Sequence, residues 1–386
     1  MSLYLQISPE TRFHRLEGSL ALESGERLRG VEIAYRTWGE LAPARDNAVV
    51  IVHALTGSAD VDRWWGKLLG PGRAFDPGSD FVLSVNLLGS CYGTTGPASP
   101  RAGPARTGDG APARPVSDGR WGPDFPAITP RDQARLLLRL IDALGIGRLR
   151  FVVGGSLGGM VALELAMLDT GRVEAFSVLQ SPGRHGPWAI AFSELGRRAL
   201  ALDPRFRAGH YPVDDPPETG LALARSIAMT SYRSRESFDQ RFGRDLREGR
   251  FEVERYLEHQ GRKLTARFDA NAYLALLGAM DRHDVGRGRG SFEGALRSLD
   301  VPALVLSCPT DVLYPEEEQL ELAALLPRAE HVSLVSLHGH DAFLIEQESV
   351  GRILSAFRRR VASERRGEAG PAAAQRDRAQ GSCLLC

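Results

Sequence analysis

The segment "FVVGGSLGGMVALELAM", Phe151 to Met167, constrains the fold more than any other part of the chain. An apolar run typical of a buried strand leads into the letters GGSLG, and an apolar, helix-like run follows. This is the G-x-S-x-G pattern of a sharp strand-to-helix turn, which lifts a serine hydroxyl out of the edge of a sheet. A glycine-rich turn used only for close packing is the alternative. The strand before the turn and the helix after it favour Ser156 as a nucleophile.

Short apolar runs alternate with longer amphipathic ones along much of the chain, which predicts an α/β fold with a mostly parallel central sheet. The stretch from Thr129 to Gly147 has a start signal, a stripe of Leu and Ile with helical period and a glycine stop, so it predicts a helix. That helix leads directly into the serine strand. The expected buried strands are 48–55, 80–89, 148–155, 173–182, 301–309 and 331–339.

The strand pattern disappears between residues 184 and 298, where polar helical segments take its place. We therefore expect a sheet domain made of residues 1–183 and 299–360, with a helical cap inserted at 184–298. A loop rich in Gly, Pro, Ala and Arg covers 99–124. Residues 361–386 have a low-complexity composition that predicts a disordered tail.

The composition is that of an ordinary globular protein. Of 386 residues, 43% are hydrophobic, which is enough for a large core, and the formal net charge of zero gives no sign of a nucleic acid partner. The N-terminal sequence lacks the pattern of a signal peptide, and no apolar run reaches the length of a membrane span. We expect a cytoplasmic protein. The four cysteines make no disulfide framework, and the His and Cys spacings indicate no metal site.

A serine nucleophile needs a histidine base and an acid that orients the base, in the chain order Ser, Asp or Glu, His. Asp311 follows the predicted strand 301–309, and His340 follows the predicted strand at 331–339. Asp311 could instead be a turn aspartate, because Pro-Thr-Asp is turn chemistry in itself. His338 is the competing histidine. Position in the chain favours Asp311 and His340 as the partners of Ser156.

Acyl transfer through a serine also needs two N–H groups that stabilise the oxyanion. The backbone N–H of Leu157 lies at the start of the helix after the nucleophile and is the first expected donor. The second should come from a loop after an early strand, and the segment "VIVHALTGSAD" predicts the backbone N–H of Leu55. In that loop we expect His53 to orient the backbone and not to bind a metal.

The chain contains a series of motifs that go beyond those of general esterases. In order they are HALTG, NLLGSCYGTTGPAS, GPDFPAITPRD, GGSLGGM, ARSIAMTSYRS, GRKLTARFDANAYL, PTDVLYPEEE and HGHDAFL. Over about residues 15 to 358 the chain resembles the homoserine O-acetyltransferase family of the α/β-hydrolase superfamily. The resemblance implies an α/β-hydrolase fold with a helical cap, and a triad of Ser156, Asp311 and His340.

The same resemblance implies that Arg225 and Asp341 hold the amino-acid substrate. Homoserine is a zwitterion, for which a guanidinium suits the carboxylate and a carboxylate suits the ammonium group. From the residues alone, Arg225 reads as a solvated arginine on a cap helix. Asp341, next to His340, could instead be a second acid that orients the imidazole.

The expected reaction is a ping-pong transfer of an acetyl group from acetyl-CoA to L-homoserine, which gives O-acetyl-L-homoserine for methionine synthesis. The resemblance implies acetyl-CoA as a co-substrate with no bound cofactor, and a homodimer without nucleic acid or membrane partners. The alternatives are a homoserine O-succinyltransferase, a serine O-acyltransferase, an esterase or thioesterase that uses water, and a catalytically silent binding protein.

Overall fold

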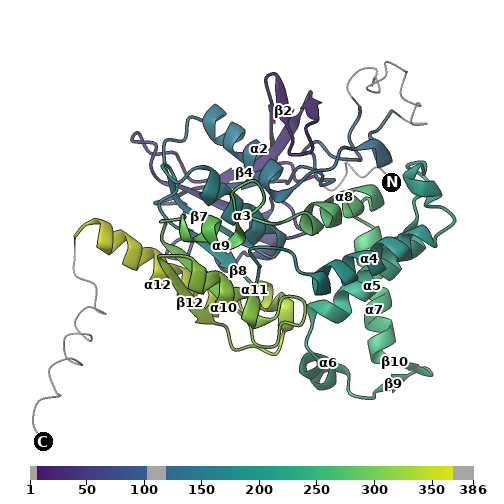
Figure 1. Cartoon of the computed structure of the whole chain (residues 1–386). Helices are drawn as coiled ribbons and strands as arrows, with labels where there is room; N and C mark the ends of the chain where they lie inside the picture. Colours follow the sequence, from purple (N-terminus) through teal and green to yellow (C-terminus); the bar gives the residue numbers. More distant parts are fainter. Residues whose placement is uncertain (1–6, 102–118, 368–386) are drawn as a thin grey trace, which may run out of the picture.

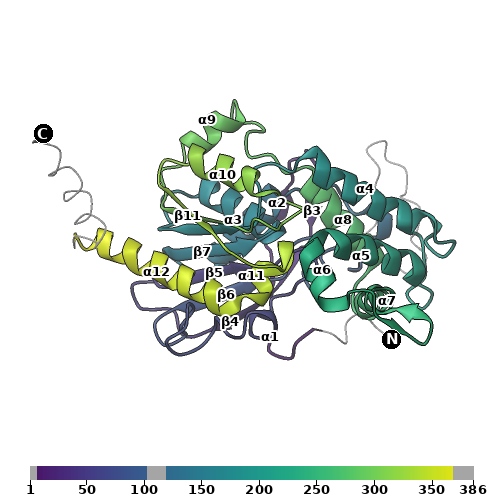
Figure 2. The same cartoon turned by 90° about the horizontal axis from the view of Figure 1, so that it is seen from below.

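The central feature of the computed structural model, which describes residues 7–101 and 119–367, is an eight-stranded sheet with helices on both faces (Figures 1 and 2). The strand order is β1-β4-β6-β5-β7-β8-β11-β12. β4 runs antiparallel to both of its neighbours, and the strands from β6 to β12 are parallel. The predicted α/β class with a mostly parallel sheet is therefore confirmed. The sheet strands are β1 (Arg12–Arg15), β4 (Glu32–Trp38), β5 (Ala48–Val52), β6 (Phe81–Val85), β7 (Leu149–Gly155), β8 (Phe176–Leu179), β11 (Ala303–Ser307) and β12 (Ala329–Ser333).

The helices pack on the two faces of this sheet and form two hydrophobic cores. Alternate side chains of β5 point to opposite faces, so Val50 lies in one core and Val49 in the other. The first core lies under α2 (Pro130–Ala143), α3 (Leu157–Leu168), α9 (Phe292–Arg297) and α10 (Glu316–Leu325). The second lies under α1 (Val61–Trp64), α11 (Ala342–Ile345) and α12 (Gln347–Arg365).

The helix predicted at 129–147 is α2, which begins with a capping box. The Thr129 hydroxyl accepts from the Asp132 N–H at 3.1 Å, and the Asp132 carboxylate accepts from the Thr129 N–H at 3.1 Å. Each of the six predicted strands overlaps an observed one: five contain the observed strand, and the sixth, predicted at 331–339, corresponds to a strand that begins earlier, at Ala329, and ends at Ser333. The sequence analysis named no strand before residue 48 and so missed β1, β4 and a small hairpin of β2 (Ser19–Ala21) with β3 (Arg27–Arg29).

Helices α4 to α8 form a cap beside the carboxyl ends of the parallel strands (Figures 1 and 2). α5 lies between α4 and α7. The cap elements are α4 (Pro187–Ala201), α5 (Glu218–Tyr232), α6 (Arg235–Phe242), the hairpin of β9 (Leu246–Arg247) and β10 (Arg250–Phe251), α7 (Glu252–Thr265) and α8 (Ala270–Asp281). Short 3-10 turns occur at Gly122–Asp124, at Arg207–Gly209 and at η4 (Gly339–Asp341).

Two boundaries differ from the expected ones. α9 falls within the range assigned to the cap, yet it contacts α10 of the sheet domain, so the cap helices end with α8. α12 continues to Arg365, so the chain is still helical where we expected the tail to begin. The rest of the predicted tail, 368–386, and the middle of the predicted loop, 102–118, lie outside the described residues.

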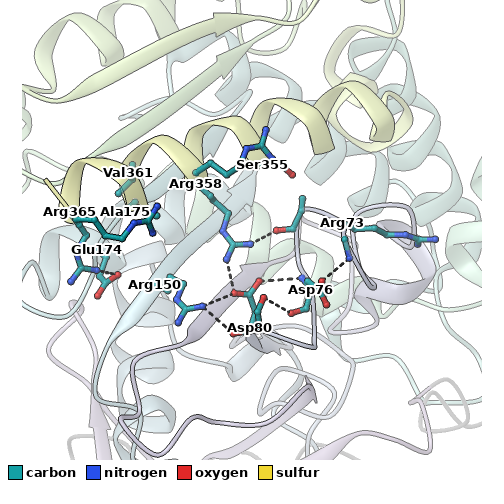
Figure 3. A pocket seen from close by; sticks show the side chains of 16 residues that line it. Arg73, Asp76, Asp80, Arg150, Glu174, Ala175, Ser355, Arg358, Val361 and Arg365 are labelled. Atoms are coloured by element: carbon teal, nitrogen blue, oxygen red, sulfur yellow. Dashed lines mark hydrogen bonds and ion pairs between the residues drawn. The ribbon is translucent and has the colours of Figure 1, made fainter. Parts of the chain in front are cut away.

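α12 is fastened to the amino ends of the parallel strands by a buried carboxylate, Asp80 (Figure 3). Arg358 of α12 donates to Asp80 at 2.7 Å, and Arg150 of β7 donates to it at 3.4 Å. These residues line an open cavity of about 680 Å³. The cavity lies at the edge of the sheet opposite Ser156, and none of the predicted site residues lines it.

Candidate active site

Ser156 stands at the turn between β7 and α3, in a backbone conformation that non-glycine residues rarely adopt (φ 55°, ψ −127°). The neighbouring glycines are required by close approach of the backbone. A Cβ on Gly154 would overlap the carbonyl of Gly158, and a Cβ on Gly158 would overlap the carbonyl oxygen of Val52 at the end of β5. The Ser156 N–H donates to the Leu179 carbonyl of β8 at 3.0 Å. Three adjacent strands therefore hold the serine in its strained turn.

Asp311 and His340 come together beyond the carboxyl ends of β11 and β12. His340 Nδ1 lies 2.8 Å from Asp311 Oδ2, and both side chains are buried. The other oxygen, Asp311 Oδ1, accepts from the N–H groups of Leu313 and Tyr314 at 2.9 and 3.0 Å. Asp311 is thus a turn aspartate through one oxygen and the partner of the histidine through the other. Nε2 of His340 is left for proton transfer.

His338, the competing histidine, lies in other surroundings. Its Nδ1 is 3.3 Å from Arg233 Nη1, and its Nε2 is 4.0 Å from Glu346 Oε1. His340 is the histidine that the fold places against Asp311.

Aromatic rings enclose the His340 imidazole. The ring centroids of Tyr314, Tyr232 and Phe343 lie 5.1, 5.6 and 5.9 Å from that of His340. Tyr232 belongs to cap helix α5, whereas Tyr314 and Phe343 belong to the sheet domain. The cap therefore closes one side of the base and limits its contact with water.

Gln180 is a site residue that the sequence analysis missed. It is fully buried at the end of β8, where its Nε2 donates to Asp311 Oδ2 at 2.9 Å and to the Gly339 carbonyl at 3.0 Å. Its Oε1 accepts from the Phe343 N–H at 3.0 Å. One amide thus joins the acid, the His340 turn and α11. A polar residue directly after a buried apolar strand, in "SVLQSP", was the available signal.

The two predicted oxyanion donors lie on adjoining segments. Leu157 is the first residue of α3, where N–H groups have no partner within the helix. Leu55 lies in the turn after β5, whose end passes over the elbow glycines. His53 holds this turn: its Nε2 accepts from the Leu87 N–H at 3.0 Å, so Nδ1 donates to the Ala54 carbonyl at 2.8 Å. Burial lowers the pKa of His53 to about 4, which keeps the ring neutral.

The two predicted substrate residues lie on elements that contact each other, α5 and η4. Arg225 is half-buried, with its guanidinium carbon 5.4 Å from the centroid of the Tyr232 ring. Asp341 already has a partner, because its Oδ2 lies 3.1 Å from Nε of Arg233. Burial raises the pKa of Asp341, while Arg233, Arg225 and His340 act in the opposite direction. Arg233 is a second residue that the sequence analysis did not assign.

The site therefore combines a strained serine, a buried Asp–His pair and two arginines beside a carboxylate. Such a set can activate a hydroxyl, stabilise an oxyanion and bind a small ion with charges of both signs. Within residues 7–101 and 119–367, no helix is both long and apolar enough to cross a membrane.

Comparison with known proteins identifies both the fold family and the closer protein family of the chain. Residues 47–347 match the alpha/beta hydrolase fold family. The homoserine O-acetyltransferase of Chloroherpeton thalassium is 46% identical over 358 residues, which cover 92% of this chain and 91% of that protein. The chain belongs to the homoserine O-acetyltransferase family. The predicted family is confirmed by this identity, which extends over the sheet domain and the cap.

Two solved structures show that the fold alone does not distinguish a homoserine O-acetyltransferase from an esterase. The homoserine O-acetyltransferase from Bacillus anthracis has a TM-score of 0.80 at 24% identity, covering 90% of this chain and 97% of its own. Esterase E22 has the same TM-score and identity, covering 90% and 99%. Membership of the homoserine O-acetyltransferase family therefore depends on the sequence match and not on the fold.

Proposed function

We propose that the chain transfers an acetyl group from acetyl-CoA to the hydroxyl of L-homoserine, through an acetyl-enzyme on Ser156. The observation that carries the proposal is the 46% identity over 92% of the chain to a protein named homoserine O-acetyltransferase. The bond of 2.8 Å between His340 and Asp311, beyond the same sheet edge as the serine elbow, supports the covalent route.

In the first half-reaction, His340 Nε2 takes the Ser156 proton while Ser156 Oγ attacks the thioester carbonyl. The oxyanion accepts from the N–H groups of Leu55 and Leu157. Collapse of the tetrahedral intermediate breaks the C–S bond, and the proton on His340 passes to the departing sulfur. Asp311 holds the imidazole tautomer and stabilises its cation. We propose that acetyl-CoA is a co-substrate and that the chain needs no bound cofactor.

In the second half-reaction, His340 takes the proton of the homoserine hydroxyl, whose oxygen attacks the acetyl ester. Collapse breaks the bond to Ser156 Oγ, which recovers its proton from His340. The product is O-acetyl-L-homoserine. Water would compete as the acceptor, so the aromatic enclosure of the base and the cap above it favour transfer over hydrolysis.

We propose that Arg225 binds the carboxylate of homoserine and that Asp341 binds its ammonium group. The half-buried Arg225 lies on α5, which contacts the η4 turn that carries Asp341. The Arg233 guanidinium lies 3.1 Å from one Asp341 oxygen and fixes the position of that carboxylate, while the other oxygen can accept from the ligand.

The test separates the two half-reactions in an Arg225→Ala variant. We expect CoA release from acetyl-CoA to proceed at the parental rate, and product formation at limiting homoserine to fall about 10²-fold, the loss of a charge-assisted bond to an ionised group. The exposed cap residue Arg198 provides the matched control, Arg198→Ala, which should change neither. Ser156→Ala should abolish both steps.

Equal losses of acylation and transfer in Arg225→Ala would remove Arg225 from the amino-acid site. Rapid release of acetate that does not depend on homoserine would favour the esterase alternative. Parallel assays with succinyl-CoA as the donor and L-serine as the acceptor decide between acetyl and succinyl transfer, and between the two amino acids.

On the family resemblance we further propose that the chain acts in the cytoplasm as a homodimer and supplies methionine synthesis. Light scattering after size exclusion should then give twice the chain mass of 42.0 kDa. Expression should restore growth without methionine in a bacterial strain that cannot acylate homoserine. A monomer, or no growth with soluble protein present, would contradict the respective proposal.

A further inference from the structure

A row of buried polar side chains runs from the catalytic histidine into the cap. The Tyr314 ring stands edge-on to His340, with the two ring planes at 73°. The Tyr314 hydroxyl lies 3.1 Å from His185 Nδ1. His185 Nε2 lies 3.5 Å from Asp281 Oδ1, and the second oxygen of Asp281 accepts from Arg197 Nη1 at 2.6 Å. None of these residues other than His340 belongs to the reaction scheme above.

The burial of Tyr314 and His185 indicates that these polar side chains do more than fill space. Tyr314 is fully buried and the His185 side chain is 1% exposed, so a phenylalanine and a leucine would fill the same space. A buried hydroxyl or imidazole is unfavourable unless it is hydrogen-bonded. The sequence nevertheless places polar groups at both positions, where the Tyr314 hydroxyl and His185 Nδ1 are hydrogen-bonded to each other.

The chemistry of the row fixes the direction of the hydrogen bond between Tyr314 and His185. Burial lowers the pKa of His185 to about 4, so the ring is neutral and has one donor and one acceptor nitrogen. A carboxylate only accepts, so the nitrogen facing Asp281 carries the hydrogen. Nδ1 then accepts from the Tyr314 hydroxyl, which fixes the orientation of the phenol.

Tyr314 contacts both partners of Ser156. Its ring packs on His340, and its backbone N–H donates to Asp311 Oδ1 at 3.0 Å. A shift of Tyr314 would therefore disturb the imidazole and the carboxylate together. Because geometry at a reacting group is exacting, a displacement of about 1 Å can lower a rate about 10²-fold.

The row crosses the junction between the cap and the sheet domain. The chain enters the cap at 183–185 and leaves it at 283–285, and these segments pair: the His185 N–H donates to the His283 carbonyl at 2.9 Å, and the Val285 N–H donates to the Gly183 carbonyl at 3.2 Å. Asp281 ends α8, and Arg197 belongs to α4. Among the described residues neither His185 Nε2 nor Asp281 Oδ1 has a hydrogen-bond partner, so their 3.5 Å contact is one that a small cap movement can tighten or release.

We infer that Tyr314 and His185 are positioning residues that hold the His340 ring against Asp311, and that Asp281 makes this arrangement depend on a docked cap. The inference rests on the proposed function only for the roles of Ser156 and His340. It adds a route by which the position of the cap affects acylation, since the row begins at the catalytic base and ends on α4.

The experiment measures acetylation of Ser156 by p-nitrophenyl acetate, a donor that requires the triad and not the amino-acid site. We expect Tyr314→Phe and His185→Leu each to lower the rate of the p-nitrophenol burst by roughly 10-fold or more. The double variant should be no slower than His185→Leu, because both changes remove the same hydrogen bond. His185→Gln, which can accept from Tyr314 and donate to Asp281, should recover most of the rate. In each variant the KM for homoserine should stay unchanged.

His283→Leu is the matched control, since it removes a buried histidine at the same junction that bonds to the Pro182 carbonyl and not to Tyr314. It should reduce stability without changing the burst. Bursts that stay at the parental rate in folded Tyr314→Phe and His185→Leu would overturn the inference, as would an equal loss in His283→Leu. If the parent reacts with p-nitrophenyl acetate but not with acetyl-CoA and homoserine, the proposed function is wrong, and the burst comparison still decides the positioning role.

Discussion

Gln180 offers a sharp test of how the site is held together, because its one amide makes three buried hydrogen bonds. Gln180→Ala leaves the Phe343 N–H and the Gly339 carbonyl without this partner and removes one donor from Asp311. The Gly339 carbonyl also accepts from the Ala342 N–H, so the Phe343 N–H is the backbone group left without a partner. At about 1 to 3 kcal/mol for that group, the free energy of unfolding should fall by at least that amount.

Activity should fall more than stability alone explains, because the same amide positions the acid and the His340 turn. We expect kcat to drop roughly 10²-fold in the folded enzyme. Gln133→Ala is the matched control: Gln133 is also buried, and its Nε2 donates to the Leu88 carbonyl at 2.9 Å, away from the Asp–His pair. Its loss should be about 1 to 3 kcal/mol with kcat per folded molecule unchanged.

Urea unfolding gives the stabilities, and initial rates with acetyl-CoA and homoserine, corrected for the folded fraction, give kcat. Gln180→Glu separates hydrogen bonding from packing, since it keeps the size but turns the donor toward Asp311 into an oxygen. The reasoning fails if Gln180→Glu keeps parental activity at neutral pH, or if both alanine variants lose activity only in proportion to their unfolding.

Two further predictions concern stability and leave the chemistry unchanged. Asp80→Ala removes the carboxylate that joins Arg358 and Arg150 and should lower the free energy of unfolding by about 3 kcal/mol, while kcat of the folded enzyme stays at the parental value; an unchanged urea midpoint would contradict the role of Asp80 in fastening α12. Burial lowers the pKa of His283 to about 3, below its unfolded value of about 6.5, so the unfolded chain binds the additional proton and stability is lost as the pH falls from about 6.5 toward 3. The difference between the parent and His283→Asn should therefore change by up to about 1.4 kcal/mol per pH unit between pH 6 and 4.5, and parallel stability curves over that range would show that His283 does not titrate in this way.

The sequence by itself determined the nucleophile turn and the order of its partners. The strand, the glycines and the helix around Ser156 are contiguous, so one short segment encodes a local geometry that only small residues permit. Asp311 and His340 were found by position, because each follows a buried apolar strand and the carboxyl ends of parallel strands meet at one edge of a sheet. The helix at 129–147 was also predicted correctly, because its N-cap residue and its stripe of Leu and Ile are local signals.

β4 was missed because its sequence does not look buried. Arg36 lies within the strand and is 6% exposed, yet it is paired with Asp60 at 2.8 Å and with Asp62 at 2.6 Å. A buried arginine is acceptable only with such partners, and these lie beyond β5, just before and within α1. Hydrophobic periodicity cannot report an ion pair between distant segments.

Only the tertiary structure decided which polar groups meet at the site. Gln180 donates to Asp311, which is 131 positions away in the sequence. Arg233, at the end of cap helix α5, contacts Asp341 of the η4 turn. The family resemblance implied that Asp341 binds the substrate, while the fold also places Arg233 beside it. Local patterns specify strands, turns and caps because their causes lie within a few residues. The pairing of buried polar side chains depends on how whole elements pack, so no local pattern encodes it.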